Sequence, residues 1–193
     1  MKYEKLDKFL EVHNGYITTA QLNDIGIPRY RIPELISEKR IRKVARGIYI
    51  DNELIEDEYY ILQLRFSNLI FSHNTACHLL DLSDRAPYEL DVSIPINKRI
   101  DANLNIHYVS EEKFDIGIIE INSPYGNPIK IYNAERCICD LIKNPNAVDI
   151  ETYNKVLRNY FKSKNKDLVK LTNYAKKFNI CDKLNIIMDV IKW

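Results

Sequence analysis

The stretch "ISEKRIRKVARGIYI", residues 36–50, decides how the first part of the chain folds. Residues 41–44 and 48–51 are rich in β-branched side chains and predict two short strands. Gly47 stands between them, at a turn position that needs a positive φ. The stretch therefore predicts a tight hairpin.

This hairpin carries a high density of positive charge for a chain whose net charge is only +1. Five cations fall within eight residues: Lys39, Arg40, Arg42, Lys43 and Arg46. Such a density suits a strand pair that lies along phosphates, whereas a solvated turn does not need it. The alternative interpretation is a solvated face that Glu34 and Glu38 stabilise.

Three helical segments precede the hairpin. Residues 2–13 have apolar side chains at helical spacing, and Thr18 or Thr19 can cap a second helix that runs to residue 25. Gly26 predicts a turn, and a third helix follows Pro28. Helix, short helix, turn, helix and basic hairpin is the order of a winged helix-turn-helix, whose third helix enters the major groove of DNA.

Pro33 leaves the start of the third helix open, because proline inside a helix removes a hydrogen-bond donor and normally kinks it. The helix begins either at Pro28 or near Pro33. In the second case Arg29 and Arg31 lie in the turn before it. We expect DNA contacts from ten residues: Arg29, Arg31, Lys39, Arg40, Arg42, Lys43, Arg46, Thr19, Gln21 and Tyr30.

The distribution of charge indicates two separate electrostatic surfaces. Residues 1–46 carry a formal charge of +4, residues 47–154 carry −10, and residues 155–193 carry +7. Four acids within residues 53–58 mark the first change of sign. We therefore expect a winged helix-turn-helix domain at residues 1–52 and a second domain at residues 53–193.

The second domain mixes strand and helix patterns and then ends in helices. Strand-like runs cover residues 89–95, 104–109, 116–122 and 129–132, and a Gly-Asn-Pro turn joins the last two as a hairpin. Helical runs cover residues 55–66, 74–82, 134–143, 150–162, 167–178 and 183–191. Helix caps are expected at Ser72, at Asn133, at Asp149 and at Asn165 or Lys166. The predicted fold class is α+β: a winged helix-turn-helix domain, then a mixed α/β domain that ends in several helices.

The C-terminal helices carry another basic feature. Five cations would follow one stripe if the helix were continuous: Lys155, Arg158, Lys162, Lys166 and Lys170. Apolar and aromatic side chains occupy the opposite face. A solvated lysine face explains this pattern as well as a binding surface does.

No combination of residues indicates a metal site or a cofactor. His73, Cys77 and His78 include an i, i+4 pair, but a metal site needs a further ligand on the same face, and none is evident. We expect core or capping roles for these residues. The four cysteines fit no paired zinc spacing, and we interpret them as buried, reduced thiols.

Catalysis is not indicated either. Glu89, Asp91 and Lys98 resemble the strand-borne acid–lysine set of metal nucleases, but their spacing does not match a carboxylate-x-lysine pair. No phosphate-binding glycine loop, HExxH, G-x-S-x-G or dinucleotide fingerprint occurs. We expect no catalytic residue, no metal and no cofactor.

Four segments together resemble a known family. The winged helix that ends in "RKVARGIYI" is followed by "SHNTACHLLDLSDR", "YGNPIKIYNAERCICDLI" and "FKSKNKDLVKLTNYAKKFNI". This set is similar to the AbiEi family, the antitoxins of type IV (abortive-infection) toxin–antitoxin systems, over nearly the whole chain. Carried over to this sequence, DNA contact falls on the basic residues at positions 29–46, and antitoxin action falls on the second domain, with residues 155–170 the first place to look.

The resemblance implies a function and its partners. The winged helix would bind inverted repeats in its own promoter and repress the operon, and the second domain would counter an AbiEii-like nucleotidyltransferase toxin without a stable complex. We expect a monomer in solution, with two protomers on operator DNA. No run approaches the length of a membrane span and no signal-peptide core is present, so we expect a cytoplasmic protein.

Two other functions stay open from the sequence. One is a metal-dependent nuclease in the region of residues 70–150, guided by the winged helix. The other is an ordinary transcription factor whose second domain senses a ligand.

Overall fold

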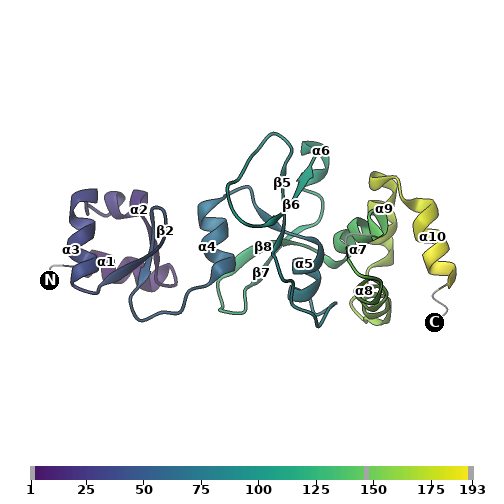
Figure 1. Cartoon of the computed structure of the whole chain (residues 1–193), viewed down its shortest axis with the longest axis horizontal. Coiled ribbons are helices and arrows are strands. Elements are labelled where there is room, and N and C mark those ends of the chain that lie inside the picture. The colour runs from purple at the N-terminus through teal and green to yellow at the C-terminus, as the bar shows by residue number, and fades with distance from the viewer. Residues whose placement is uncertain (1–2, 146–147, 191–193) are drawn as a thin grey trace. The chain divides into compact units, whose positions relative to one another are not determined.

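A computed structural model describes residues 3–145 and 148–190 of the chain. Contacts divide the chain into two compact units, and each is described by itself. The N-terminal unit is Met1–Ser67 with Asn122–Ile129, and the C-terminal unit is Asn68–Ile121 with Lys130–Trp193. The fold class is mixed α and β, as predicted, and Figure 1 shows the elements with their labels.

The N-terminal unit has the expected order of elements. Its helices and strands are α1 (Glu4–Val12), β1 (Tyr16–Thr18), α2 (Thr19–Asp24), the 3-10 helix η1 (Arg29–Arg31), α3 (Ile32–Ser37), β2 (Ile41–Ala45), β3 (Ile48–Asp51) and α4 (Glu58–Arg65). The three strands form one antiparallel sheet in the order β1-β3-β2. The hairpin predicted from residues 36–50 is therefore confirmed.

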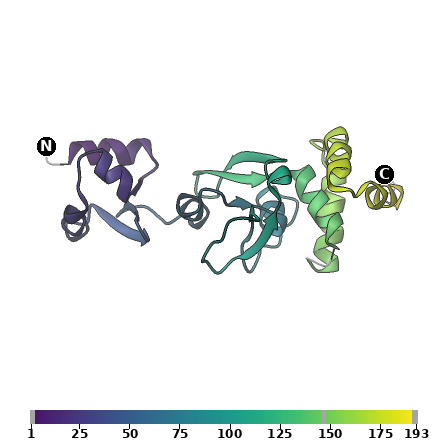
Figure 2. The ribbon, with the colours of Figure 1, turned by 90° about the horizontal axis from the view of Figure 1, so that it is seen from above.

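One apolar cluster joins the three helices to this sheet. Leu6 and Leu10 of α1 pack with Leu22 of α2, with Leu35 of α3 and with Ile41 of β2, and all five are buried. These residues are the apolar positions of the helical repeats, so burial of one face of each helix fixes the arrangement. The helices α1–α3 beside the small sheet can be followed in Figures 1 and 2.

Local chemistry sets the boundaries of these elements. Thr18 is the N-cap of α2, because its Oγ accepts from the backbone N–H of Gln21 while Gln21 Oε1 accepts from the backbone N–H of Thr18 at 2.8 Å. Gly47 has φ +74° in the turn of the hairpin, as its position predicts. Pro33 lies in the first turn of α3. The second of the two starts left open by the sequence is therefore the right one.

Asp57 ties the segment 122–129 to the N-terminal unit. Its buried carboxylate caps α4 by accepting from the backbone N–H groups of Tyr59 and Tyr60 at 3.1 and 3.2 Å. Oδ2 also accepts from the Ser123 hydroxyl and from Asn127 Nδ2, the latter at 2.7 Å. By contacts, α4 and this turn belong with the winged helix. The boundary expected after residue 52 stays a prediction about independent folding.

A mixed five-stranded sheet forms the centre of the C-terminal unit, in the order β6-β5-β4-β8-β7. The strands are β4 (Ile70–Phe71), β5 (Asp91–Pro95), β6 (Asn105–Val109), β7 (Ile118–Asn122) and β8 (Pro128–Tyr132). β4 pairs antiparallel with β5 and parallel with β8, and β5 pairs parallel with β6. The sequence predicted four of these strands within three residues at each end, but it missed β4, which has only two residues.

Six helices complete the described part of this unit: α5 (His73–Leu79), α6 (Glu111–Phe114), α7 (Ala134–Lys143), α8 (Ile150–Lys162), α9 (Leu168–Phe178) and α10 (Cys181–Val190). α7 contacts α5, α8 and α9, and α10 contacts α9. The last helices are the green to yellow coils near the C-terminus in Figure 2. Asn133 and Asp149 cap α7 and α8 as expected. The cap expected at Asn165 or Lys166 was wrong: Asp167 caps α9 by accepting from the Lys170 backbone N–H at 2.8 Å.

The structure also bears on the cysteines and on the length of the helices. Cys77, Cys137 and Cys139 are buried, Cys181 is half-buried, and all four are free thiols. Among the described helices, none has the length and apolar composition that crossing a membrane requires.

Candidate nucleic-acid interface

The segment between α2 and α3 presents an exposed group of polar and aromatic side chains. Arg29, Tyr30 and Arg31 form the single turn η1, which leads directly into α3. Tyr30 is 80% exposed, although a tyrosine ring normally buries part of its surface. Its ring is therefore available to a ligand.

The hairpin places the other predicted cations. Lys43 lies in β2, and Arg46 stands beside Gly47 in the turn between β2 and β3. The Thr19 backbone N–H donates to the Gly47 carbonyl at 2.9 Å, so the start of α2 is attached to this turn. The tip of the hairpin and the start of α2 are thereby held next to each other.

Three of the seven predicted cations are paired with carboxylates. Arg31 Nε lies 3.2 Å from Glu34 Oε2, while Arg40 pairs with Asp7 and Arg42 with Glu56. Arg42 also donates to the Leu54 carbonyl at 2.8 Å. These pairs lie at the surface, where an ion pair contributes at most about 1 kcal/mol. A phosphate can therefore replace the carboxylate at small cost.

The remaining four cations form no ion pair with any residue that the structure describes: Arg29, Lys39, Lys43 and Arg46. Two of them lie at the hairpin, one on η1, and one at the end of the turn after α3. Free cations at these points are what a winged helix needs to contact the phosphate backbone.

Thr19 and Gln21 already have partners within the protein. The Thr19 hydroxyl donates to the Gly47 carbonyl at 3.4 Å, and Gln21 Oε1 accepts from both the backbone N–H and the hydroxyl of Thr18. The Gln21 amide nitrogen is not used in the capping box. Contact of these two residues with DNA stays a prediction.

The basic stripe expected on the C-terminal helices is interrupted. α8 ends at Lys162 and α9 begins at Leu168, so the five cations do not lie on one continuous helix. Lys155 pairs with Asp84, and Lys170 pairs with Asp167 at 3.3 Å. Lys166 Nζ donates to the Ser163 carbonyl at 3.1 Å. An antitoxin surface formed by Lys155, Arg158, Lys162, Lys166 and Lys170 stays a prediction.

Comparison with known families supports the interpretation of the N-terminal unit. Residues 4–50 match a family model described as "Transcriptional regulator, AbiEi antitoxin". Residues 4–50 are AbiEi-like. The match covers α1 to β3, which are the elements that carry all ten predicted DNA contacts.

One solved structure is similar over a longer span than this AbiEi-like segment. The crystal structure of the RV2827C protein from Mycobacterium tuberculosis matches 94% of this chain and 78% of that chain, with a TM-score of 0.54 and 13% sequence identity. At this identity the likeness shows the fold alone. No curated protein matches the chain significantly.

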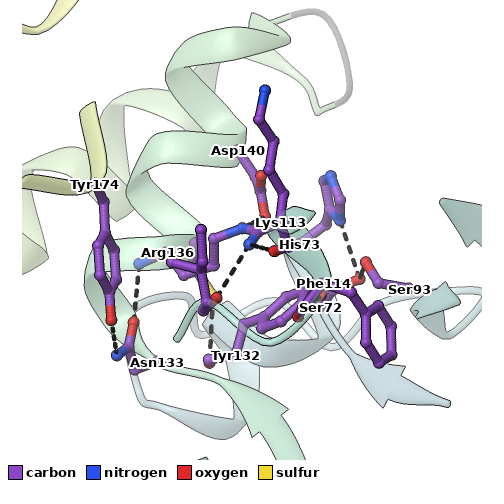
Figure 3. A network of polar contacts seen from close by, with 12 residues as sticks. Ser72, His73, Ser93, Lys113, Phe114, Tyr132, Asn133, Arg136, Asp140 and Tyr174 are labelled. Carbon is purple, nitrogen blue, oxygen red and sulfur yellow. Dashed lines mark hydrogen bonds and ion pairs between the residues drawn. The ribbon is translucent and has the colours of Figure 1, made fainter. Parts of the chain in front are cut away.

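The C-terminal unit contains a buried polar network outside the AbiEi-like segment (Figure 3). Arg136 of α7 is 2% exposed, and its Nε donates to Asp140 Oδ2 at 2.9 Å. Its Nη1 donates to the carbonyls of Lys113 at 2.7 Å and Ile116 at 3.0 Å. Burial raises the pKa of the Asp140 carboxyl, and the Arg136 guanidinium opposes this shift.

Aromatic rings and a glycine complete the surroundings of Arg136. Its guanidinium lies 4.2 Å from the centroid of the Tyr132 ring and 4.3 Å from that of Phe178. Gly117 has φ +87°, and a Cβ there would lie 2.8 Å from Arg136 Cβ. Glycine is therefore required for the backbone to approach this closely.

Two histidines stack beside this network. The rings of His73 and His107 have centroids 3.5 Å apart, and His107 Nε2 lies 2.8 Å from Asp91 Oδ1. Burial, together with the neighbouring His107, lowers the pKa of His73 to about 3. His73 also has φ +46°, a left-handed conformation that few residues other than glycine adopt.

The structure separates the residues that the sequence had grouped as possible metal ligands. His78 Nδ1 lies 3.2 Å from the Ser83 carbonyl, Cys77 is buried, and only His73 faces the histidine stack. Asp91 serves as partner to His107 and accepts from Asn105 Nδ2 at 2.6 Å. Among the described residues, no three His, Cys, Asp or Glu side chains gather in a way that could hold a metal ion.

Proposed function

We propose that the chain is a DNA-binding repressor of its own operon and the antitoxin of a type IV toxin–antitoxin pair, with no catalytic activity of its own. The observation that supports this most is the set of four unpaired cations on η1, after α3 and on the hairpin. These cations lie within the segment that matches the AbiEi regulator family.

In this proposal the two parts of the interface have different roles. Tyr30 and the start of α3 face the major groove, and Lys43 and Arg46 of the hairpin contact backbone phosphates. Each phosphate contact releases counterions, so affinity falls as salt rises. Two protomers bind an inverted repeat, because the two-fold symmetry of such a site matches a pair of identical DNA-binding domains.

The test is a mobility-shift assay with the DNA upstream of the chain's own gene, at several salt concentrations. The double variant Lys43→Ala/Arg46→Ala should weaken binding and reduce the slope of log K against log salt by about 2, because two phosphate contacts are lost. Lys5→Ala/Lys8→Ala on α1 is the matched control, with the same loss of charge in the same unit. Equal slopes for the two double variants would refute the role of the hairpin.

The antitoxin part of the proposal is tested in cells that express the neighbouring nucleotidyltransferase-like gene in the cytoplasm. The full chain should restore growth, and the hairpin double variant should restore it equally well while failing to repress the promoter. The full chain is used because Asp57 bonds to Ser123 and Asn127, which links α4 to a distant part of the sequence. Toxicity that persists in the presence of well-expressed full chain would contradict the proposal, as would cleavage of nucleic acid by the purified protein.

A further inference from the structure

We propose that a cleft in the C-terminal unit binds the phosphate group of a small ligand. The cleft has a volume of about 650 Å³, within the range of roughly 300–1,000 Å³ that small-molecule sites span. Its charged and titratable lining residues come from α5, β6, α6 and α7: His73, His107, Lys113, Arg136, Asp140 and Lys143. This inference does not depend on the DNA-binding proposal.

The charges around the cleft favour an anion. Three cationic side chains face one carboxylate, that of Asp140, which already accepts from Arg136. The ammonium groups of Lys113 and Lys143 form no hydrogen bond or ion pair with a residue in the described part of the chain. Lys113 Nζ lies 6.0 Å from the centroid of the Phe178 ring, which leaves its N–H donors free of any acceptor among the described residues. Cations that line a concave site focus a positive potential into it.

Arg136 adds a fixed donor at the base of the cleft. Nε and Nη1 are bound to Asp140 and to two backbone carbonyls, and the guanidinium is packed between the rings of Tyr132 and Phe178. Nη2 donates to none of the described residues. Because Arg136 lines the cleft, this nitrogen is the part of the guanidinium that is left to donate to a ligand there. A guanidinium in a fixed orientation is well suited to phosphate oxygens.

A chain of two hydroxyl groups holds the ring of His73 at the edge of the cleft. Ser93 donates to Ser72 Oγ at 2.9 Å, and Ser72 Oγ lies 3.0 Å from His73 Nδ1. This chain occupies Nδ1 and leaves Nε2 as the other polar atom of the ring. Figure 3 shows this chain of contacts next to Arg136. Nε2 has no hydrogen-bond partner among the described residues and is available to a ligand.

These groups together favour phosphate over other ligands. The cleft offers two ammonium groups and one guanidinium nitrogen, which are all donors, beside an imidazole ring, while its one carboxylate is occupied. A phosphate monoester has several oxygens that accept charge-assisted hydrogen bonds, so it can use all of these donors at once. The source is either free inorganic phosphate or the phosphate of a nucleoside monophosphate.

The test is isothermal titration of the purified full chain at constant ionic strength, with inorganic phosphate and, in a second series, adenosine monophosphate. Potassium chloride at matched ionic strength is the blank. The variant Lys113→Gln/Lys143→Gln removes both ammonium charges with little change in size. Lys164→Gln, an exposed lysine between α8 and α9, is the control, and thermal melting checks that every variant is folded.

Saturable binding of at least one probe is expected, about tenfold weaker or more in the double variant and unchanged in the control, because two charge-assisted hydrogen bonds to the phosphate are lost. Binding of both probes would identify the phosphate group as the recognised part. Tighter binding of the nucleotide would identify it as the source. Absence of saturable binding for both probes, or equal binding by the double variant and the wild type, would overturn the proposal whatever the outcome of the DNA assay.

Discussion

Arg42 and Arg136 are both paired with a carboxylate, but they belong to environments with opposite properties. Arg42 lies on a strand of the hairpin, and the side chains of Arg42 and Glu56 are 32% and 49% exposed. Arg136 lies on a central helix of the C-terminal unit, and the side chains of Arg136 and Asp140 are 2% and 10% exposed. The first pair is open to solvent on part of its surface, and the second is enclosed by rings and backbone carbonyls.

The difference shows which arginine can leave its partner. Water stabilises both members of the Arg42 pair when they separate, so a phosphate can replace Glu56. In the Arg136 pair, separation would leave a buried charge without a partner, so the pair is permanent. The hairpin cations are therefore suited to reversible contact with a polymer, whereas Arg136 is suited to holding a fixed geometry around a cleft.

The largest effect is expected at Arg136. Arg136→Met leaves Asp140 buried and unpaired and removes the donor for two carbonyls, so the free energy of unfolding should fall by roughly 3–5 kcal/mol. Arg136→Met/Asp140→Leu removes the unpaired carboxylate as well and should be less destabilised than the single variant. Urea unfolding measures both. Asp140→Leu completes the comparison. If the losses of unfolding free energy in Arg136→Met and Asp140→Leu add up to the loss in the double variant, the two side chains do not interact.

The next effect concerns pH, and it applies to the C-terminal unit only. The pKa of His73 is lowered to about 3 in the folded chain, so the unfolded chain binds a proton that the folded chain does not bind between pH 6.5 and pH 3. The contribution of the neutral His73 ring to the free energy of unfolding is complete above pH 6.5 and is lost as pH falls. At pH 5 the loss amounts to about 2 kcal/mol. His107, Asp91, Arg136 and Lys143 act on this ring.

The measurement compares urea unfolding of the wild type and His73→Asn from pH 8 to pH 5. Asparagine tolerates the left-handed conformation at this position, so the variant removes the titrating ring without adding backbone strain. The difference in unfolding free energy between the two proteins should decline toward pH 5. Parallel curves would show that His73 is not held neutral by the fold.

Much of the fold follows from local patterns in the sequence. The helix caps at Thr18, Asn133 and Asp149, the turn at Gly47 and the periodicity of apolar residues were enough to predict most elements. Short elements were not predicted, because β4 has two residues and α6 has four, which is too few to show a repeat of apolar positions. At the end of α8, any of several polar residues could cap the next helix, and Asp167 was not the one expected.

The two candidate sites also differ in how far the sequence could predict them. The ten candidate DNA contacts are concentrated in a short stretch, so the density of cations and the expected order of helices and hairpin were enough to nominate them. The cleft of the C-terminal unit joins α5, β6, α6 and α7, which lie far apart in the sequence. The i, i+4 spacing of Arg136 and Asp140 was a signal, but this spacing normally indicates an exposed pair. In the structure, however, the guanidinium is buried and donates to the backbone carbonyls of residues 113 and 116, which the sequence could not show.

The smallest effect is expected when Arg42 is released from its ion pair with Glu56. This change tests the comparison of the two arginines most directly. Glu56→Gln removes the carboxylate that holds the guanidinium and should tighten operator binding a few-fold at low salt, because an exposed ion pair is worth about 0.2–1 kcal/mol. The gain should disappear in Glu56→Gln/Arg42→Ala, measured against Arg42→Ala alone in the same shift assay. Glu53→Gln, an exposed acid of the same segment, is the control for the loss of one negative charge. A gain of equal size in this control would mean that general electrostatics, and not the release of Arg42, determines the affinity.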